Sequence, residues 1–63
     1  MYTIKFSVEF ADSSKTFQRN NISRAMVLKM RKVLLEKYGT SLISFSVYDK
    51  NNHFSKILSY EGR

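Results

Sequence analysis

The side chains that most often carry acid–base chemistry are few in this sequence and lie far apart along it. The histidine is His53, and the carboxylates are Glu9, Asp12, Glu36, Asp49 and Glu61. No two carboxylates have a spacing that brings them together for acid and base roles. Because no nucleophile or orienting carboxylate can be named for His53, we interpret it as a solvated histidine of a hairpin and not as a general base.

Other catalytic and metal-binding patterns are equally lacking in the sequence. The serines lie outside any nucleophile elbow, and neither of the two glycines belongs to a phosphate-binding loop. With no cysteine and one histidine, the chain has no set of zinc ligands. We therefore expect a non-enzyme without a cofactor, a metal ion or a small-molecule substrate.

Length and charge narrow the choice of partners. The 63 residues allow a single domain, residues 1–63, and leave no room for a deep catalytic cavity. Eleven Lys and Arg against five Asp and Glu give a net charge of +6, which favours a polyanionic partner. Small domains that work outside the cell usually contain disulfides, so the lack of cysteine predicts a cytoplasmic protein. No apolar run approaches the roughly 20 residues of a membrane span, and we expect no membrane partner.

The first third of the chain predicts a β-hairpin. Residues 2–10 alternate apolar with polar side chains, which is the pattern of a strand with one buried face. Short polar side chains at 11–14 favour a turn. Residues 15–19, with Phe17 as their large apolar residue, predict a short edge strand whose charges discourage unwanted pairing.

A long helix is expected at residues 22–38, since this segment contains neither glycine nor proline and is rich in helix-forming residues. Asn21 is the expected N-cap, and Gly39 is the residue expected to end the helix. At about 100° per residue, one arc of the helix is apolar and is the predicted core face. That arc comprises Ile22, Met26, Val27, Met30, Val33, Leu34 and Tyr38.

A second hairpin is predicted after the helix. Residues 42–48 alternate again and predict a strand, and turn-forming residues follow at 49–52. The last strand is expected at 53–60, but its apolar residues do not agree on which face of the strand is buried. Phe54, Leu58 and Tyr60 favour one face, whereas Ile57 favours the other, and a bulge near Ser55 would relieve the conflict.

Together these elements predict an α+β fold of order β-β-α-β-β, with one helix packed on a four-stranded, mostly antiparallel sheet. A right-handed crossover through the helix would place the first strand parallel to one strand of the second hairpin. In the order of its elements and in length, the chain resembles β-grasp modules such as the immunoglobulin-binding domains of protein G. The resemblance includes no shared motif, so it implies a topology and transfers no binding residue.

A basic surface on the helix is the leading candidate for a binding site. Residues 22–38 carry five cations and one anion, and Arg24, Arg31 and Lys32 project from one side of the helix. Lys5 and Lys56 are expected to project from the sheet. Because such a surface neutralises phosphates, we predict that these side chains engage nucleic acid or a nucleic-acid-processing complex. An ordinary solvated helix face is the alternative.

A protein contact is the competing interpretation. Leu28 and Leu35 lie outside the predicted core arc and are bordered by Arg24 and Arg31, a composition that suits an acidic protein surface. If both leucines are exposed, a homodimer packed helix to helix would cover them; if the helix is rotated, one of them is core. Such a chain would modulate a host protein, in the manner of phage or mobile-element factors, and would use either this helix surface or an exposed edge of the sheet.

The outer face of the sheet offers a third surface. Tyr48, with Phe54 or Ile57 depending on register, would join Lys5 in an aromatic and basic platform on which single-stranded bases stack. An ordinary cross-strand pair is the alternative, because the sequence contains no aromatic-rich nucleoprotein motif.

Overall fold

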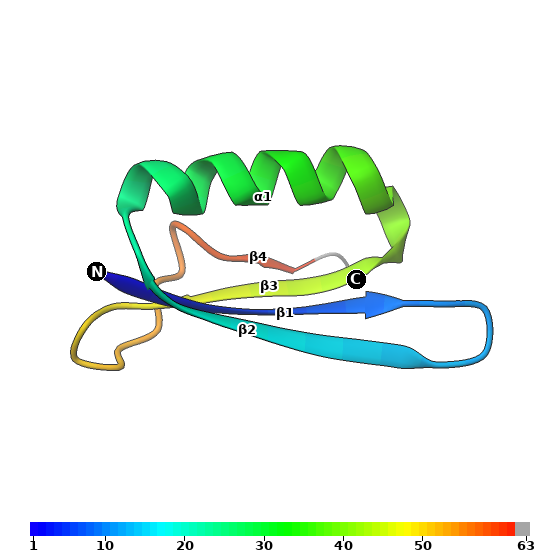
Figure 1. Ribbon diagram of the computed structural model, residues 1–63, viewed down its shortest axis with the longest axis horizontal. Coiled ribbons are helices and arrows are strands. Elements are labelled where there is room, and N and C mark those ends of the chain that lie inside the picture. The colour runs from blue at the N-terminus through cyan, green and yellow to red at the C-terminus, as the bar shows by residue number, and fades with distance from the viewer. Residues whose placement is uncertain (62–63) are drawn as a thin grey trace.

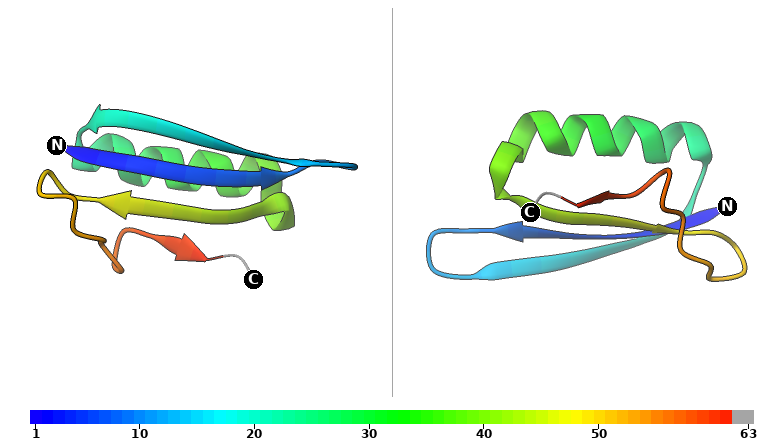
Figure 2. Two further views of the ribbon diagram at one scale, coloured as in Figure 1. Left: turned by 90° about the horizontal axis from the view of Figure 1, so that it is seen from below. Right: turned by 180° about the vertical axis from the view of Figure 1, so that it is seen from behind.

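The strict alternation of the first strand places it inside the sheet. The computed structural model describes residues 1–61, and its β1 (Tyr2–Glu9) buries Ile4, Phe6 and Val8 on one face. The strands lie in the order β2-β1-β3-β4, and every pairing is antiparallel (Figure 1; Figure 2, left). A strand with neighbours on both sides under a helix needs an unbroken apolar face, which this alternation supplies.

The second strand forms an edge of the sheet and is longer than predicted. β2 (Ser14–Ile22) extends beyond the expected residues 15–19 and has β1 as its neighbour in the sheet. The register of the pair shifts between Tyr2 and Ile4 of β1, and Asn21 on the opposite strand has a φ of 55°. Asparagine tolerates this left-handed conformation better than most residues, so it ends the regular part of the edge.

The helix begins later than predicted, because Ser23 and not Asn21 is its N-cap. In α1 (Arg24–Tyr38), the amide of Met26 donates a hydrogen bond to the Ser23 hydroxyl at 3.3 Å, which satisfies one of the unpaired amides of the first turn. Asn21 is therefore wrong as the cap. Ile22, expected in the helix, is the last residue of β2.

The predicted end of the helix at Gly39 is confirmed. Gly39 has a φ of 55°, a conformation that glycine adopts without steric cost, and its amide donates to the carbonyl of Leu35. A single 3-10 turn, η1 (Gly39–Ser41), then leads directly into β3 (Leu42–Tyr48), which matches the predicted third strand.

The last segment departs from the prediction, because residues 53–60 do not form a strand. Phe54 makes an isolated bridge to Tyr48, and the chain then rises toward α1 before β4 (Tyr60–Glu61) pairs with β3 (Figure 1). The expected strand is replaced by a turn, in which the amide of Leu58 donates to the Ser55 hydroxyl at 3.4 Å.

This turn resolves the ambiguous parity of the sequence. Leu58 is 4% exposed and belongs to the core, whereas its neighbour Ile57 is 84% exposed. A continuous strand would have placed these two side chains on opposite faces while turning the charged Lys56 to the same face as Leu58. By leaving the sheet, the chain buries Leu58 without turning Lys56 toward the core.

The predicted four-stranded, β-grasp-like sheet is wrong, although the α+β class holds. Three long antiparallel strands make up the sheet, β2-β1-β3, and β4 adds two residues at the edge of β3. β1 pairs antiparallel with β3, so the expected parallel pair is replaced by an antiparallel one. The helix instead joins β2 to β3, which run in the same direction on either side of β1. β3 takes the place beside β1 because it sustains an apolar face and the 53–60 segment does not.

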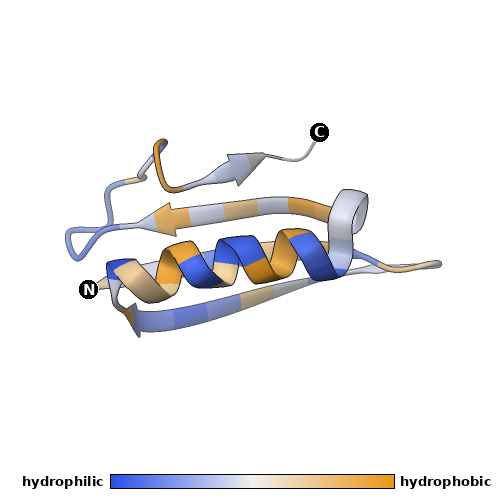
Figure 3. Ribbon diagram, turned by 90° about the horizontal axis from the view of Figure 1, so that it is seen from above, coloured by the Kyte–Doolittle hydropathy of each residue, from blue (hydrophilic) through white to orange (hydrophobic). Residues whose placement is uncertain are grey.

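The core lies between α1 and the strands β1 and β3. Its buried side chains are Ile4, Phe6, Val8, Val27, Leu42, Phe45, Val47 and Leu58. The predicted core arc of the helix is wrong for Met26 and Val33, which are 44% and 48% exposed. Leu35, placed outside that arc by the sequence, packs against the core. Compared with the prediction, the helix is rotated about its own axis, because it faces β1 and β3 and leaves β2 at its side (Figure 3).

Candidate nucleic-acid interface

A turn built around one carboxylate positions the aromatic part of the candidate site. The Oδ1 atom of Asp49 accepts hydrogen bonds from the backbone amides of Asn51 at 2.8 Å and His53 at 2.9 Å. The bond from the His53 amide, helped by the bond from Asn51 and by the neighbouring His53 and Lys50 side chains, holds the pKa of Asp49 below its ordinary value. The ionised carboxylate therefore closes the turn that returns Phe54 to β3.

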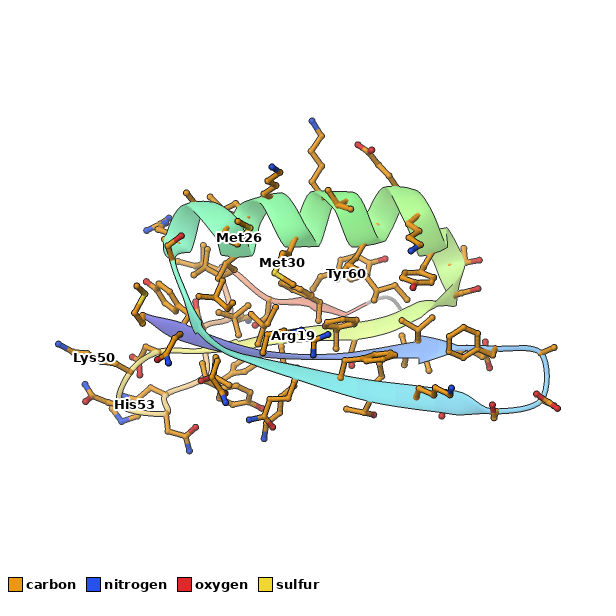
Figure 4. The ribbon with its side chains drawn as sticks, viewed as in Figure 1. Arg19, Met26, Met30, Lys50, His53 and Tyr60 are labelled. Carbon is orange, nitrogen blue, oxygen red and sulfur yellow. The ribbon has the colours of Figure 1, made fainter. Side chains whose placement is uncertain are left out.

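His53 lies on this exposed loop beside Lys50, on the far side of the sheet from the helix (Figure 4). Its Nδ1 atom is 3.8 Å from Oδ2 of Asp49, so a carboxylate does adjoin the histidine. Both side chains are solvated, with exposed fractions of 78% and 40%. The contact belongs to the turn, in keeping with the interpretation of His53 as a hairpin residue.

The side chains of Lys5, Tyr48 and Phe54, which we call the aromatic platform, meet on the face of the sheet that points away from α1. Lys5 Nζ lies over the Tyr48 ring, 5.4 Å from its centroid, within the range of a cation–π contact. The Tyr48 and Phe54 rings meet edge to face with centroids 5.8 Å apart. Phe54 remains 57% exposed. The platform thus presents a fixed apolar ring and a cation to solvent.

A groove of about 580 Å³, which we call the β3 groove, opens beside the platform. It exists because the chain leaves the edge of β3 after Ser55, whose amide donates to the Val47 carbonyl, and returns to it at Tyr60. In that interval the amide of Val47 donates to the Ser59 hydroxyl at 2.9 Å. The groove is lined by Ile43, Ser44, Ser46, Phe54, Lys56, Ser59 and Tyr60. Its walls therefore combine aromatic rings, hydroxyl groups and one ammonium group.

The structure divides the five predicted nucleic-acid residues between two surfaces. Lys5 and Lys56 are exposed and border the platform and the β3 groove. Arg24, Arg31 and Lys32 lie on α1, on the opposite side of the sheet. Arg31 is half-buried, and its Nε atom is enclosed without a hydrogen-bond partner among residues 1–61. The five side chains do not form one continuous stripe.

The two leucines of the predicted protein contact have different environments. Leu28 is 44% exposed, whereas Leu35 is half-buried and packs against the core. The rotation of the helix thus realises the alternative in which one leucine is core. Arg24, one turn before Leu28, is exposed and remains beside it.

Sequence reasoning missed most of the residues that line the β3 groove. Tyr48 and Lys5 were expected on one face because both belong to regularly alternating segments. The groove arises only where alternation fails, and the turn that creates it depends on the Ser55 and Ser59 hydroxyls. The sequence signal for this turn was the pair Ser55 and Ser59, which lie on either side of Ile57, the residue that conflicts with the parity of the predicted strand.

Two further features of the described residues concern metals and membranes. Residues 1–61 contain no group of three or more His, Cys, Asp or Glu side chains placed to hold a metal ion. The one helix in this range lacks the length and apolar character needed to cross a membrane.

No family model matches the chain, and no curated protein and no solved structure is detectably similar to it.

Proposed function

We propose that this protein binds single-stranded nucleic acid on the outer face of its sheet, through the aromatic platform and the β3 groove. The observation that carries the proposal is the contact of Lys5 with Tyr48 beside the exposed Phe54 ring. Stacking surfaces of this kind bind bases without regard to sequence, because every base has a π face. The adjoining lysine supplies a charge for the neighbouring phosphate.

The exposure of Phe54 supports a stacking role. A phenylalanine that is 57% exposed at the rim of a groove loses most of the free energy that burial of its ring would give. Tyr48 holds the Phe54 ring from one side and leaves its remaining surface open. A base that stacked there would bury this surface and would gain about 1–3 kcal/mol.

The β3 groove supports binding of the sugar and phosphate. Ser44, Ser46 and Ser59 carry hydroxyls that donate and accept hydrogen bonds, and Lys56 lies at the same wall. Together with the net charge of +6, these groups suit a polyanion. The groove contains no planar amide or guanidinium group that would read a base edge, so the proposal is binding with little sequence preference.

The helix surface is the weaker of the two candidates for nucleic acid. Arg31, at its centre, is half-buried and has its Nε atom enclosed, which restricts the guanidinium to fewer donors. Leu28 interrupts the cations with an exposed apolar side chain. On the outer face, Phe54 offers an exposed ring for stacking on unpaired bases. We place this activity in the cytoplasm, as an expectation of the proposal.

The test measures the affinity of fluorescein-labelled 12-nucleotide single strands by anisotropy, with duplexes of the same sequence for comparison. Phe54→Ala is expected to weaken single-strand binding roughly 5- to 150-fold, because it removes the stacking surface. Ile57→Ala is the matched control, since Ile57 is an exposed apolar neighbour that lies outside the groove. Duplexes should bind more weakly than single strands.

The salt dependence separates the two basic surfaces. Replacing Lys5 and Lys56 with glutamine is expected to flatten the slope of log affinity against log salt by about 0.7 for each phosphate that is no longer neutralised. Arg31→Gln and Lys32→Gln should leave the slope unchanged. If these helix variants flatten the slope and Phe54→Ala binds normally, the nucleic acid lies on the helix and the proposal is wrong.

A further inference from the structure

The inner face of β2 is left uncovered by the helix. Figure 3 shows α1 lying over the middle of the sheet, with β2 along its side. In the register of the β1–β2 pair, Lys15, Phe17 and Arg19 are the partners of Val8, Phe6 and Ile4, so they point to the side of the sheet that carries α1. Phe17 stacks on Phe6 with centroids 5.1 Å apart, whereas Lys15 and Arg19 are exposed.

The flank of α1 that faces β2 is apolar and exposed. Met26 and Val33, seven residues apart on this flank, are 44% and 48% exposed, and Met30 between them is half-buried. Figure 4 shows Met26 and Met30 on the helix above Arg19, whose side chain lies close to the strands. We call these six residues the β2 face: Lys15, Phe17, Arg19, Met26, Met30 and Val33.

Among the described side chains of residues 1–60, no carboxylate lies within 4.0 Å of the two cations of the β2 face. Arg19 donates from Nη1 to the Gln18 carbonyl at 2.9 Å, and Lys15 Nζ lies 5.9 Å from the centroid of the Phe10 ring. Their positions matter because they stand two residues before and two residues after Phe17 on one face of an edge strand. The edge therefore displays the pattern cation, aromatic ring, cation.

We propose that the β2 edge binds an extended acidic segment of a partner protein as an additional strand. β2 stands at the end of the strand order, so its outer edge offers backbone donors and acceptors for pairing. Side chains directly opposite each other across a new strand pair share a face. The segment that fits has two carboxylates four residues apart, opposite Lys15 and Arg19, and an apolar residue midway between them, opposite Phe17. That residue also covers the exposed flank of α1.

A second copy of this chain does not satisfy the same face. If two β2 strands paired antiparallel with Phe17 opposite Phe17, each Lys15 would stand opposite an Arg19, and like charges directly opposite each other destabilise a pair. A shift of two residues in either direction removes that repulsion and places Phe17 opposite one cation, but the remaining cation then stands opposite Ser13 or Asn21 and gains no carboxylate. A shift toward the end of the strand also meets the distorted backbone at Asn21. The charges thus disfavour self-pairing and favour an acidic strand.

The test uses a labelled synthetic peptide with the core Glu-Thr-Leu-Thr-Glu, flanked by threonines, and measures binding by anisotropy. The control peptide has the same composition with both glutamates moved by one position, which turns their side chains to the opposite face. We expect the control peptide to bind at least about tenfold more weakly. Backbone amide shifts of β2 in NMR spectra should change with the first peptide.

Matched variants locate the binding surface. Met26→Asp is expected to lower peptide affinity at least about tenfold, because it places a carboxylate beside the acidic strand. Leu28→Asp is the control, since Leu28 has the same exposed fraction of 44% on the opposite flank of the helix. Arg19→Glu should abolish binding of the first peptide. A peptide in which lysine replaces the glutamate opposite residue 19 should bind this variant again. Circular dichroism confirms that each variant is folded.

Three results would overturn the proposal. Equal binding of the two peptides would show that strand pairing does not determine recognition. A dimer in light scattering that Met26→Asp dissociates would assign the face to a second copy. Displacement of the peptide by a short oligonucleotide, together with loss of oligonucleotide binding in Arg19→Glu, would assign it to nucleic acid. None of these results depends on the aromatic platform, which uses other residues on the other side of the sheet.

Discussion

The burial of Leu58 is the feature on which both the corrected topology and the β3 groove depend. Leu58→Ala removes three carbon atoms from a side chain that is 4% exposed. At about 0.8 kcal/mol for each buried methylene-sized group, the transfer cost alone is about 2.4 kcal/mol. The cavity left behind adds to it, but the surrounding turn is irregular and collapses more easily than a strand. We expect a loss of about 2.5–3.5 kcal/mol, in the lower half of the range for such substitutions.

Urea unfolding followed by circular dichroism measures this loss. A domain of 63 residues has a total stability of roughly 3–9 kcal/mol, so the variant should have a much lower midpoint, and at the low end of that range it would partly unfold without denaturant. Ile57→Ala is the control: Ile57 is 84% exposed, and its truncation should change the stability by less than about 0.5 kcal/mol. If Ile57→Ala lowers the stability more than Leu58→Ala does, residues 53–60 form a strand that buries Ile57 instead of Leu58. The turn that creates the β3 groove would then not exist.

Three smaller changes test the local structure. Ser23→Ala removes the cap of α1 and should cost about 1 kcal/mol in urea unfolding. Gly39→Ala should cost about 1 kcal/mol or more, because an alanine at a φ of 55° is strained although no atom lies within 4 Å of its Cβ position. Because the pKa of Asp49 is lowered in the folded state, ionisation of this carboxyl stabilises the fold. This contribution to stability is complete above the ordinary value of 3.8 and is lost as the pH falls through the folded value. The amide signals of Asn51 and His53 should shift in that acidic range, and Asp49→Asn should remove the effect.

The parts of the fold that were predictable are those encoded by neighbours in the sequence. The alternation of β1 determines which of its side chains are buried, and Gly39 ends the helix through its own backbone conformation. The turn at residues 49–52 is likewise local, because Asp49 bonds to amides two and four residues later. In each case the interaction that decides the structure lies within a few residues.

The parts that were not predictable depend on contacts between distant segments. Whether β3 or the last segment lies beside β1 is decided by which one sustains an apolar face against Ile4 and Phe6. The rotation of α1 is decided by the position of β2, and it exchanges Val33 for Leu35 at the core. A helix with apolar residues around much of its circumference fits several rotations, and only the shape of the sheet below selects one.

The placement of charge on β2 connects the fold to its candidate partners. Charges that point inward on an edge strand are a known protection against edge-to-edge association, and Lys15 and Arg19 fit that role in the free protein. The same two charges make the edge selective, because they disfavour the symmetric pairing of two copies of the chain and favour acidic strands as partners. The aromatic platform lies on the opposite face of the sheet, so an oligonucleotide and an acidic peptide do not compete for space. If both proposals hold, saturating peptide leaves the affinity for single strands nearly unchanged at physiological salt, because the two sites are separated by the sheet and screened from each other.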